Sequence, residues 1–274
     1  NSVRDDCSES LGTAVDDAVV APIDFILCGA QKCGTTGLHR TLAAHPDVLM
    51  GDTKELHHFD DEERFLCRDA EAIRAAYHAR FPEPAPGKVR GEATPIYLWW
   101  KPAMARMHAY HPGLKLIVVL RCPLQRAYSQ WVMQSSMGIE PLGFAEAVRA
   151  EFAEGDDALQ DRARSYLSRG RYAGQLKRMF RLFSRDQVLV LRKEMLDQEP
   201  DQALARVQGF LRIPVLPLRM VRAHVSPVMP LPDPALQRWL IDYFRPEVEA
   251  VERLMGWNLA HWLRPLAPPT SNSG

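Results

Sequence analysis

Residues 23–44 are the stretch that most constrains the fold of this chain. An apolar run over 23–28 is short enough for a buried strand, and Gly29 follows it directly. A polar loop with a second glycine, Gly34, comes next, and residues 36–44 carry leucines at helical spacing. Glycines let a backbone approach an anion, and a helix N-terminus offers free N–H groups and a positive dipole. The pattern predicts a strand, a phosphate-binding loop and a helix.

The spacing within this loop differs from that of the usual nucleotide triphosphate loop. That loop places its lysine directly after the second glycine and before a hydroxyl that binds magnesium. Here Lys32 precedes Gly34, and Thr35 and Thr36 follow it. We therefore expect the lysine to project from the middle of the loop toward a leaving oxygen, and the threonines to donate to a phosphate. An ordinary glycine-containing turn is the alternative for this loop alone.

A second candidate anion site follows the clearest buried strand, residues 115–120. This strand ends at Arg121, and Pro123 then starts a helix predicted to run to Gln134. A magnesium-dependent NTPase is expected to place an aspartate at such a strand end to hold the metal. An arginine indicates anion binding instead. The alternative is that Arg126 and Ser129, one helical turn apart, only cap or solvate the helix.

Residues 29–36 and 121–129 resemble two motifs of sulfotransferases that use 3′-phosphoadenosine-5′-phosphosulfate (PAPS), in particular heparan-sulfate-type N- and 3-O-sulfotransferase domains and their bacterial relatives. The resemblance implies a three-layer α/β, P-loop-like fold with a mostly parallel central sheet flanked by helices, over residues 22–263. It also implies that Arg121 and Ser129 hold the 3′-phosphate, which would select this cofactor over ATP. The residues expected to bind the 5′-phosphosulfate are Gln31, Lys32, Cys33, Gly34, Thr35 and Thr36.

A cluster of ionisable groups at residues 54–60 resembles the family segment that carries the general base. Glu55 matches that glutamate, and His57 matches an active-site histidine that orients the acceptor or shares the proton. A carboxylate within hydrogen-bond reach of a hydroxyl or amine can remove its proton as sulfur is attacked. Two alternatives are a solvated surface loop and a metal site at His57 and His58, which no other His/Cys spacing supports. We expect no metal.

One departure from the family concerns a catalytic lysine. The family often carries it in the segment that matches residues 89–97, where this chain has Ala93. Either Lys32 alone then stabilises the charge that develops in the reaction, or another cation, Lys54 or Lys101, replaces the missing lysine. Trp99 and Trp100 beside this segment either form a wall of the acceptor cleft or pack in the core.

A second departure lies near the end of the domain. The family's Lys-Gly-Arg loop over the cofactor is missing around residues 225–227, and Arg219, Arg222 and His224 are the candidate replacement charges. A further segment that resembles the family contains Tyr172. This residue either lies near the nucleotide or packs its helix against the sheet.

The remaining pattern completes the predicted architecture. Residues 1–21 are expected to form a flexible arm, residues 136–168 an acceptor-side insertion and residues 264–274 a disordered tail. The other predicted elements are strands at 48–50 and 187–191, one charged helix within 60–80, and helices over about 172–183, 200–211 and 235–255.

Composition narrows the class of partner and compartment. Lysine plus arginine and aspartate plus glutamate each number 34, so the net charge is zero and gives no support for a nucleic-acid partner or a broad basic groove. Five cysteines without a CxxC pair favour a reducing, cytoplasmic location. No signal peptide or membrane-spanning run is expected within the printed residues.

The function predicted from these features is metal-independent transfer of a sulfuryl group. PAPS is the expected donor, 3′-phosphoadenosine-5′-phosphate (PAP) the product, and the acceptor a hydroxyl or amine of a small molecule or carbohydrate. Two alternatives stay open. One is an ATP-dependent small-molecule kinase. The other is a catalytically silent nucleotide- or partner-binding protein, which Ala93 and the lost Lys-Gly-Arg loop suggest. The sequence leaves the oligomeric state open.

Overall fold

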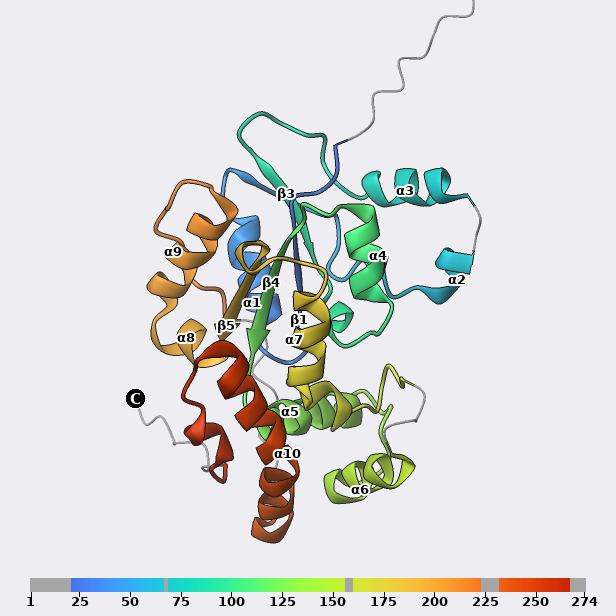
Figure 1. Ribbon diagram of the computed structural model, residues 1–274, viewed down its shortest axis with the longest axis vertical. Coiled ribbons are helices and arrows are strands. Elements are labelled where there is room, and N and C mark those ends of the chain that lie inside the picture. Colours follow the sequence, from blue (N-terminus) through green and yellow to red (C-terminus); the bar gives the residue numbers. More distant parts are fainter. Residues whose placement is uncertain (1–20, 67–68, 156–159, 223–231, 267–274) are drawn as a thin grey trace, which may run out of the picture.

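A parallel sheet of five strands forms the centre of the computed structural model, which describes residues 21–66, 69–155, 160–222 and 232–266 (Figure 1). The strand order is β2-β3-β1-β4-β5, and every neighbouring pair is parallel. The strands predicted over 23–28, 48–50, 115–120 and 187–191 are confirmed, and the segment 89–97 supplies the fifth strand. Their bounds are β1 Phe25–Gly29, β2 Val48–Met50, β3 Val89–Ala93, β4 Lys115–Leu120 and β5 Val188–Arg192.

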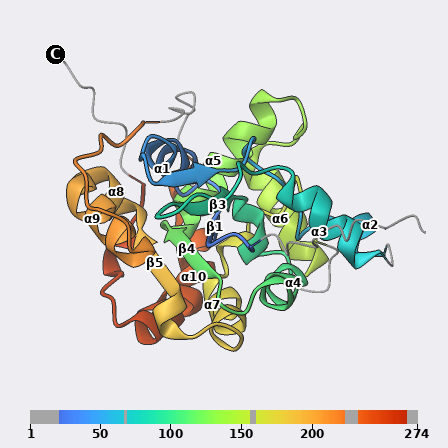
Figure 2. The same cartoon turned by 90° about the horizontal axis from the view of Figure 1, so that it is seen from above.

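Helices cover both faces of the sheet, which confirms the predicted three layers. In Figures 1 and 2, α1 (Thr35–Ala43), α8 (Lys193–Gln198) and α9 (Pro200–Leu211) lie on one side. On the other side lie α4 (Ala103–Tyr110) and α7 (Tyr172–Phe180). Because both faces are covered, the central strands read as continuous apolar runs, and all residues of β1 are buried.

Three further helices lie beyond the carboxyl ends of the strands (Figure 1). They are α5 (Pro123–Ser136), α6 (Phe144–Glu154) and α10 (Pro234–Met255). Pro123 starts α5 as predicted, since a proline at the first helical position needs no backbone N–H. The structure also contains the 3₁₀ helices η1 Pro95–Leu98, η2 Ser168–Gly170, η3 Arg185–Gln187 and η4 Ala260–Leu263.

The prediction of one helix within 60–80 is wrong. The structure has α2 (Glu62–Leu66) and α3 (Ala70–His78). The Asp69 side chain accepts a hydrogen bond from the Ala72 backbone N–H, and such a cap fixes the start of a new helix. The short helix α8 was not predicted, because the sequence pattern there indicates only the strand before it. The predicted arm and tail lie almost entirely outside the described residues.

Gly91 sets how closely β3 lies against β1. It pairs directly with Phe25, and a Cβ atom at Gly91 would lie 2.4 Å from the Phe25 ring. Both residues are buried, so the ring occupies the space that any side chain at position 91 would need. The central strands can therefore adopt this register only with a glycine here.

We expect Gly91→Ala to lower the free energy of unfolding by about 1–3 kcal/mol, since overpacking a dense core forces ring or backbone shifts. Gly174→Ala in α7 is the control. A Cβ there meets nothing within 4 Å, so the change should raise stability by up to about 1 kcal/mol. Urea unfolding measures both. Equal stability of the wild type and Gly91→Ala would contradict the packing argument.

Candidate active site

The loops that follow β1, β2, β3 and β4 all leave the same edge of the sheet, because the strands are parallel. This edge carries Lys32 after β1, Glu55 after β2, Thr94 after β3 and Arg121 after β4. Open α/β sheets bind ligands outside the carboxyl ends of their strands. Three predicted site residues, Lys32, Glu55 and Arg121, therefore lie at one edge although they are distant in sequence, and Thr94, which was not predicted, lies there too.

The loop between β1 and α1 turns on two left-handed residues. Lys32 has φ 66° and Gly34 has φ 92°, and α1 begins immediately afterwards at Thr35. No described side chain caps α1, and its first turn, which includes Thr36, contains no acidic residue. The first N–H groups of a helix lack intrahelical partners, so this end of α1 can receive an anion.

Lys32 is partly buried among other cations. Its Nζ lies 3.4 Å from the Met133 sulfur, and it forms no ion pair with a carboxylate of the described residues. Burial lowers the pKa of Lys32, and the charges of Arg121, Arg126 and Lys54 lower it further. The site therefore concentrates positive charge that a bound anion would offset.

Arg121 connects the end of β4 to the β1–α1 loop. Its guanidinium donates to the Lys32 carbonyl oxygen at 3.3 Å and to Gln125 Oε1 at 3.1 Å. Ser129 lies four residues after Gln125 and therefore on the same face of α5. Arg121 and Ser129 thus share one side of the site, and their contact with a 3′-phosphate stays a prediction.

Tyr172 contacts both the end of β4 and the β1–α1 loop. Its side chain is buried, and its hydroxyl donates to the Arg121 carbonyl oxygen at 2.9 Å. The same hydroxyl lies 3.9 Å from the sulfur of Cys33, a buried loop residue. Burial raises the pKa of both Tyr172 and Cys33. Tyr172 packs its helix against the loop, and its direct role in cofactor binding stays a prediction.

Arg126 adds a charge that sequence reasoning treated only as a possible cap. The side chain is fully buried, donates to Gln130 at 2.7 Å and to the Tyr166 carbonyl oxygen, and leaves Nε without a described partner. Burial lowers its pKa. A buried cation without a carboxylate partner close to Lys32 and Arg121 strengthens the positive potential at the loop.

Gln31 is held by an arginine that sequence reasoning missed. Its Oε1 accepts from Arg169, which is buried, lies over the Trp99 ring at 4.4 Å and donates to the Arg162 carbonyl oxygen at 2.6 Å. Burial lowers the pKa of Arg169 to about 9. Trp99 therefore packs under this arginine, and η2 fixes the side chain of Gln31.

The predicted catalytic segment forms a chain of charged groups. The Glu55 carboxylate lies 2.7 Å from Lys54 Nζ and 3.5 Å from His57 Nε2. The other ring nitrogen of His57 lies 3.0 Å from Asp60 Oδ2, and Asp60 is fully buried and bound by Arg162. The hydrogen bond to Asp60 is the main cause that raises the pKa of His57. Sequence reasoning missed Asp60, although it lies three residues after His57.

The two histidines of this segment contact different groups. His57 faces Glu55 and Asp60, whereas the His58 ring stacks on Tyr77 at 4.0 Å and is buried. Burial lowers the pKa of His58 to about 3. Within the described part of the chain, no group of three His, Cys, Asp or Glu residues is arranged to hold a metal ion.

The two residues proposed to replace the missing lysine, Lys54 and Lys101, lie in different surroundings. Ala93 is buried at the end of β3. Lys54 contacts Glu55, and its charge lowers the pKa of Lys32, so it belongs to the site. The exposed Lys101 lies beside Gln160, whose side chain accepts from its backbone N–H.

The structure describes only part of the segment that contains the candidate substitutes for the Lys-Gly-Arg loop. Arg219 and Arg222 are exposed, and between them the Val221 N–H donates to Thr41 Oγ1 of α1 at 2.9 Å. This segment therefore runs beside α1. His224 and residues 225–227 lie outside the described residues.

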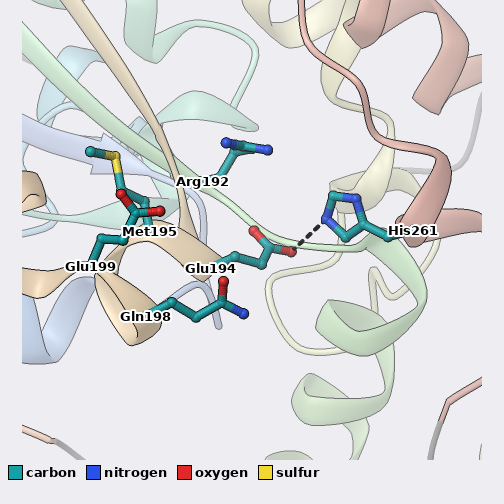
Figure 3. A pocket seen from close by; sticks show the side chains of 6 residues that line it. All are labelled: Arg192, Glu194, Met195, Gln198, Glu199 and His261. Carbon is teal, nitrogen blue, oxygen red and sulfur yellow. Dashed lines mark ion pairs between the residues drawn. The ribbon is translucent and has the colours of Figure 1, made fainter.

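The described residues outline two cavities. The smaller, about 300 Å³, lies between α8 and η4, where Glu194 points toward His261 at 3.5 Å (Figure 3). Lys32, Glu55 and His57 line neither this cavity nor the larger one. The larger, about 770 Å³ as far as the described residues define it, is bounded by α6, α7, α10 and Trp99. Trp99 contacts Arg169, which places this cavity next to the loop that carries Gln31.

The model of the sulfotransferase domain family matches residues 22–226. The chain belongs to this family. Human heparan sulfate glucosamine 3-O-sulfotransferase 6 is 33% identical over 186 residues, which cover 68% of this chain and 51% of that protein. The mouse bifunctional heparan sulfate N-deacetylase/N-sulfotransferase 1 is 29% identical over 197 residues, covering 69% of this chain and 22% of that protein.

A solved sulfotransferase from Alicyclobacillus acidocaldarius resembles this sulfotransferase domain with a TM-score of 0.75 and 30% identity, covering 89% of this chain and 100% of that one. The predicted fold is thus confirmed. The chain spans about half the length of the 3-O-sulfotransferases it matches.

No described helix has the length and apolar character needed to cross a bilayer. Cys28, Cys33 and Cys122 are free and buried, and the cytoplasmic location stays a prediction.

The raised pKa of His57 gives a direct test of this geometry. We expect Asp60→Asn to lower it toward the ordinary value of 6.5, because the hydrogen bond to the carboxylate is its main cause. The Asp60 contact should stabilise the fold below pH 6.5 and lose this effect as pH rises through the folded pKa. NMR titration of the imidazole measures the shift. Asp61→Asn is the control, since Asp61 pairs with Arg64. An unchanged His57 titration in Asp60→Asn would refute the assignment.

Proposed function

We propose that this chain transfers the sulfuryl group of PAPS to an acceptor hydroxyl or amine without a metal ion. The observation that carries the proposal is the set of cations Lys32, Arg121 and Arg126 at the uncapped N-terminus of α1, with no described carboxylate paired to any of them. Such a set favours a multiply charged anion. Family membership supports the reaction class.

The residues present fit the two ends of this cofactor. Lys32 and the first turn of α1, with Thr35 and Thr36, would hold the 5′-phosphosulfate. Arg121 and Ser129 would hold the 3′-phosphate. The unpartnered Nε of Arg126 supports an anion here, since a buried cation is stable when opposite charge is near. When bound, the cofactor supplies the sulfuryl group, and its sulfur–oxygen bond to the 5′-phosphate breaks as the acceptor bond to sulfur forms.

Glu55 would remove the acceptor proton. Its carboxylate lies at the end of the chain Asp60–His57–Glu55, in which His57 bridges the two acids. Asp60 fixes the ring of His57 through Nδ1, so Nε2 faces Glu55. The histidine can then orient the acceptor or share the proton.

Lys32 and Lys54 would offset the charge that develops on the leaving phosphate. We favour Lys54 over Lys101 as the substitute for the lysine missing at Ala93. Lys54 contacts the proposed base Glu55 and its charge acts on Lys32, whereas Lys101 is exposed and lines the larger cavity. This pair of lysines argues against the catalytically silent alternative, which Ala93 suggested.

The acceptor we favour is a small, weakly charged alcohol or carbohydrate. The large cavity beside Trp99 carries both acids and bases, including Glu151, Asp161, Arg164 and Arg178, and this mixture disfavours a long polyanion. Several relatives are named 3-O-sulfotransferases of heparan sulfate glucosamine, and this supports a hydroxyl as the acceptor group.

The test of the cofactor is calorimetric titration of the protein, without magnesium, with PAP and separately with ADP and AMP. We expect a strong preference for PAP that Arg121→Ala removes, since the charged contact to the 3′-phosphate is lost. Arg181→Ala at the far end of α7 is the control. No preference for PAP would favour the ATP-dependent kinase or another anion.

We expect Glu55→Gln to reduce turnover by a factor of about 100 or more and to leave PAP affinity unchanged, because the amide cannot accept the proton. The assay follows PAP release from PAPS with an acceptor found by screening. Glu63→Gln in α2 is the control, since that side chain is exposed. Undiminished turnover in Glu55→Gln would remove Glu55 from the role of base.

A further inference from the structure

A buried carboxylate lies behind the catalytic segment, outside the reaction described above. Glu92 of β3 is 1% exposed, and three hydroxyl groups donate to it. They belong to Tyr77 at 2.7 Å, Thr94 at 2.6 Å and Tyr97 at 3.2 Å. No cation of the described residues pairs with it. A buried carboxylate needs such donors, and here they come from α3, from η1 and from Thr94, which directly precedes η1.

Two of these hydroxyl groups also contact the catalytic segment. The Leu56 backbone N–H donates to Thr94 Oγ1 at 3.0 Å, and the His58 backbone N–H donates to the Tyr97 hydroxyl oxygen at 2.8 Å. A hydroxyl has one proton to give, so donating it to Glu92 leaves the oxygen free to accept from an N–H. The carboxylate therefore sets the direction of both hydrogen-bond chains.

The residue between these two anchor points has an unfavourable backbone conformation. His57 has φ 52°, in the left-handed region that non-glycine residues seldom adopt. Such a conformation persists only where the surroundings hold it. The bonds from Leu56 and His58 hold the backbone on either side of His57, and this conformation brings its ring between Glu55 and Asp60.

We propose that Glu92 is a positioning residue, which acts through the hydroxyl groups of Thr94 and Tyr97 to hold the Glu55–His58 segment in its reactive geometry. The roles of Glu55 and His57 come from the proposed function, and the positioning rests on contacts of the structure alone. Glu92 touches neither reacting group, so its effect is indirect.

The three hydroxyl donors stabilise the ionised form of Glu92, which is the form that accepts hydrogen bonds. Burial opposes them and raises the pKa of Glu92 to about 7. Above that pH the ionised group can accept from all three. The titratable groups that face it from neighbouring elements are Tyr77 of α3, Tyr97 of η1, Asp60, Cys28 of β1 and Tyr110 of α4.

The test compares Thr94→Val, which removes the hydroxyl at nearly constant shape, with Thr94→Ser, which keeps it. The first readout is the NMR titration of the His57 imidazole. We expect Thr94→Ser to keep the raised pKa of His57 and Thr94→Val to lower it, because the ring then loses its position against Asp60. Titration with PAP should give the same affinity within about twofold in both variants, since the cofactor loop is separate.

Turnover provides the second readout. We expect kcat of Thr94→Val to fall about tenfold or more with little change in KM for PAPS, and Thr94→Ser to restore it. Should Thr94→Val fail to fold, Tyr97→Phe makes the same test at the His58 N–H. An unchanged His57 titration in a folded Thr94→Val or Tyr97→Phe protein would overturn the proposal. Absence of PAP binding by the wild type would instead refute the proposed function, and leave the His57 comparison intact.

Discussion

The pairing of β1 with β3 and β4 is the constraint on which the site depends. These three parallel strands end at one edge, so the chain segments that leave them meet there whatever their distance in sequence. Phe25 of β1 packs against Gly91 of β3, and this close contact fixes the register of the two strands. The register in turn sets where Lys32, which follows β1, and Thr94, which follows β3, lie relative to each other. Small errors in strand pairing would therefore displace every group of the site.

Positively charged side chains gather at the same edge, and each of them is partly or fully buried. Burial lowers the pKa of Lys32 and Arg126, and the charge of Arg121 lowers both further, which means that the folded chain bears an electrostatic cost. An anionic ligand relieves that cost on binding. The acids nearby are engaged elsewhere: Glu55 with Lys54 and His57, and Asp60 with Arg162. In the proposed reaction, this arrangement would separate the basic groups that hold the cofactor from the carboxylate that faces the acceptor.

The sequence allowed prediction of most strands, of the strand–loop–helix at residues 25–43 and of the strand and helix joined at Arg121, because apolar runs, glycines and strand-end charges are local signals. Contacts between distant segments carry no such signal. Arg162 lies 102 residues from Asp60, and Arg169 lies 138 residues from Gln31, so neither partner could be inferred. The break between α2 and α3 is different. Asp69 is a recognisable capping residue, and the charged pattern around it obscured that local signal.

If Lys54 takes the part of the lysine absent at Ala93, as proposed, it links the charge of the base to that of the leaving phosphate. Lys54 contacts Glu55 at 2.7 Å and also acts on Lys32 through its charge. While Glu55 is ionised, their attraction holds the lysine beside the base. Once Glu55 accepts the acceptor proton, that attraction falls, just as negative charge grows on the leaving phosphate near Lys32. Because Lys54 contacts Glu55 and its charge also acts on Lys32, it would respond to both changes in the proposed reaction.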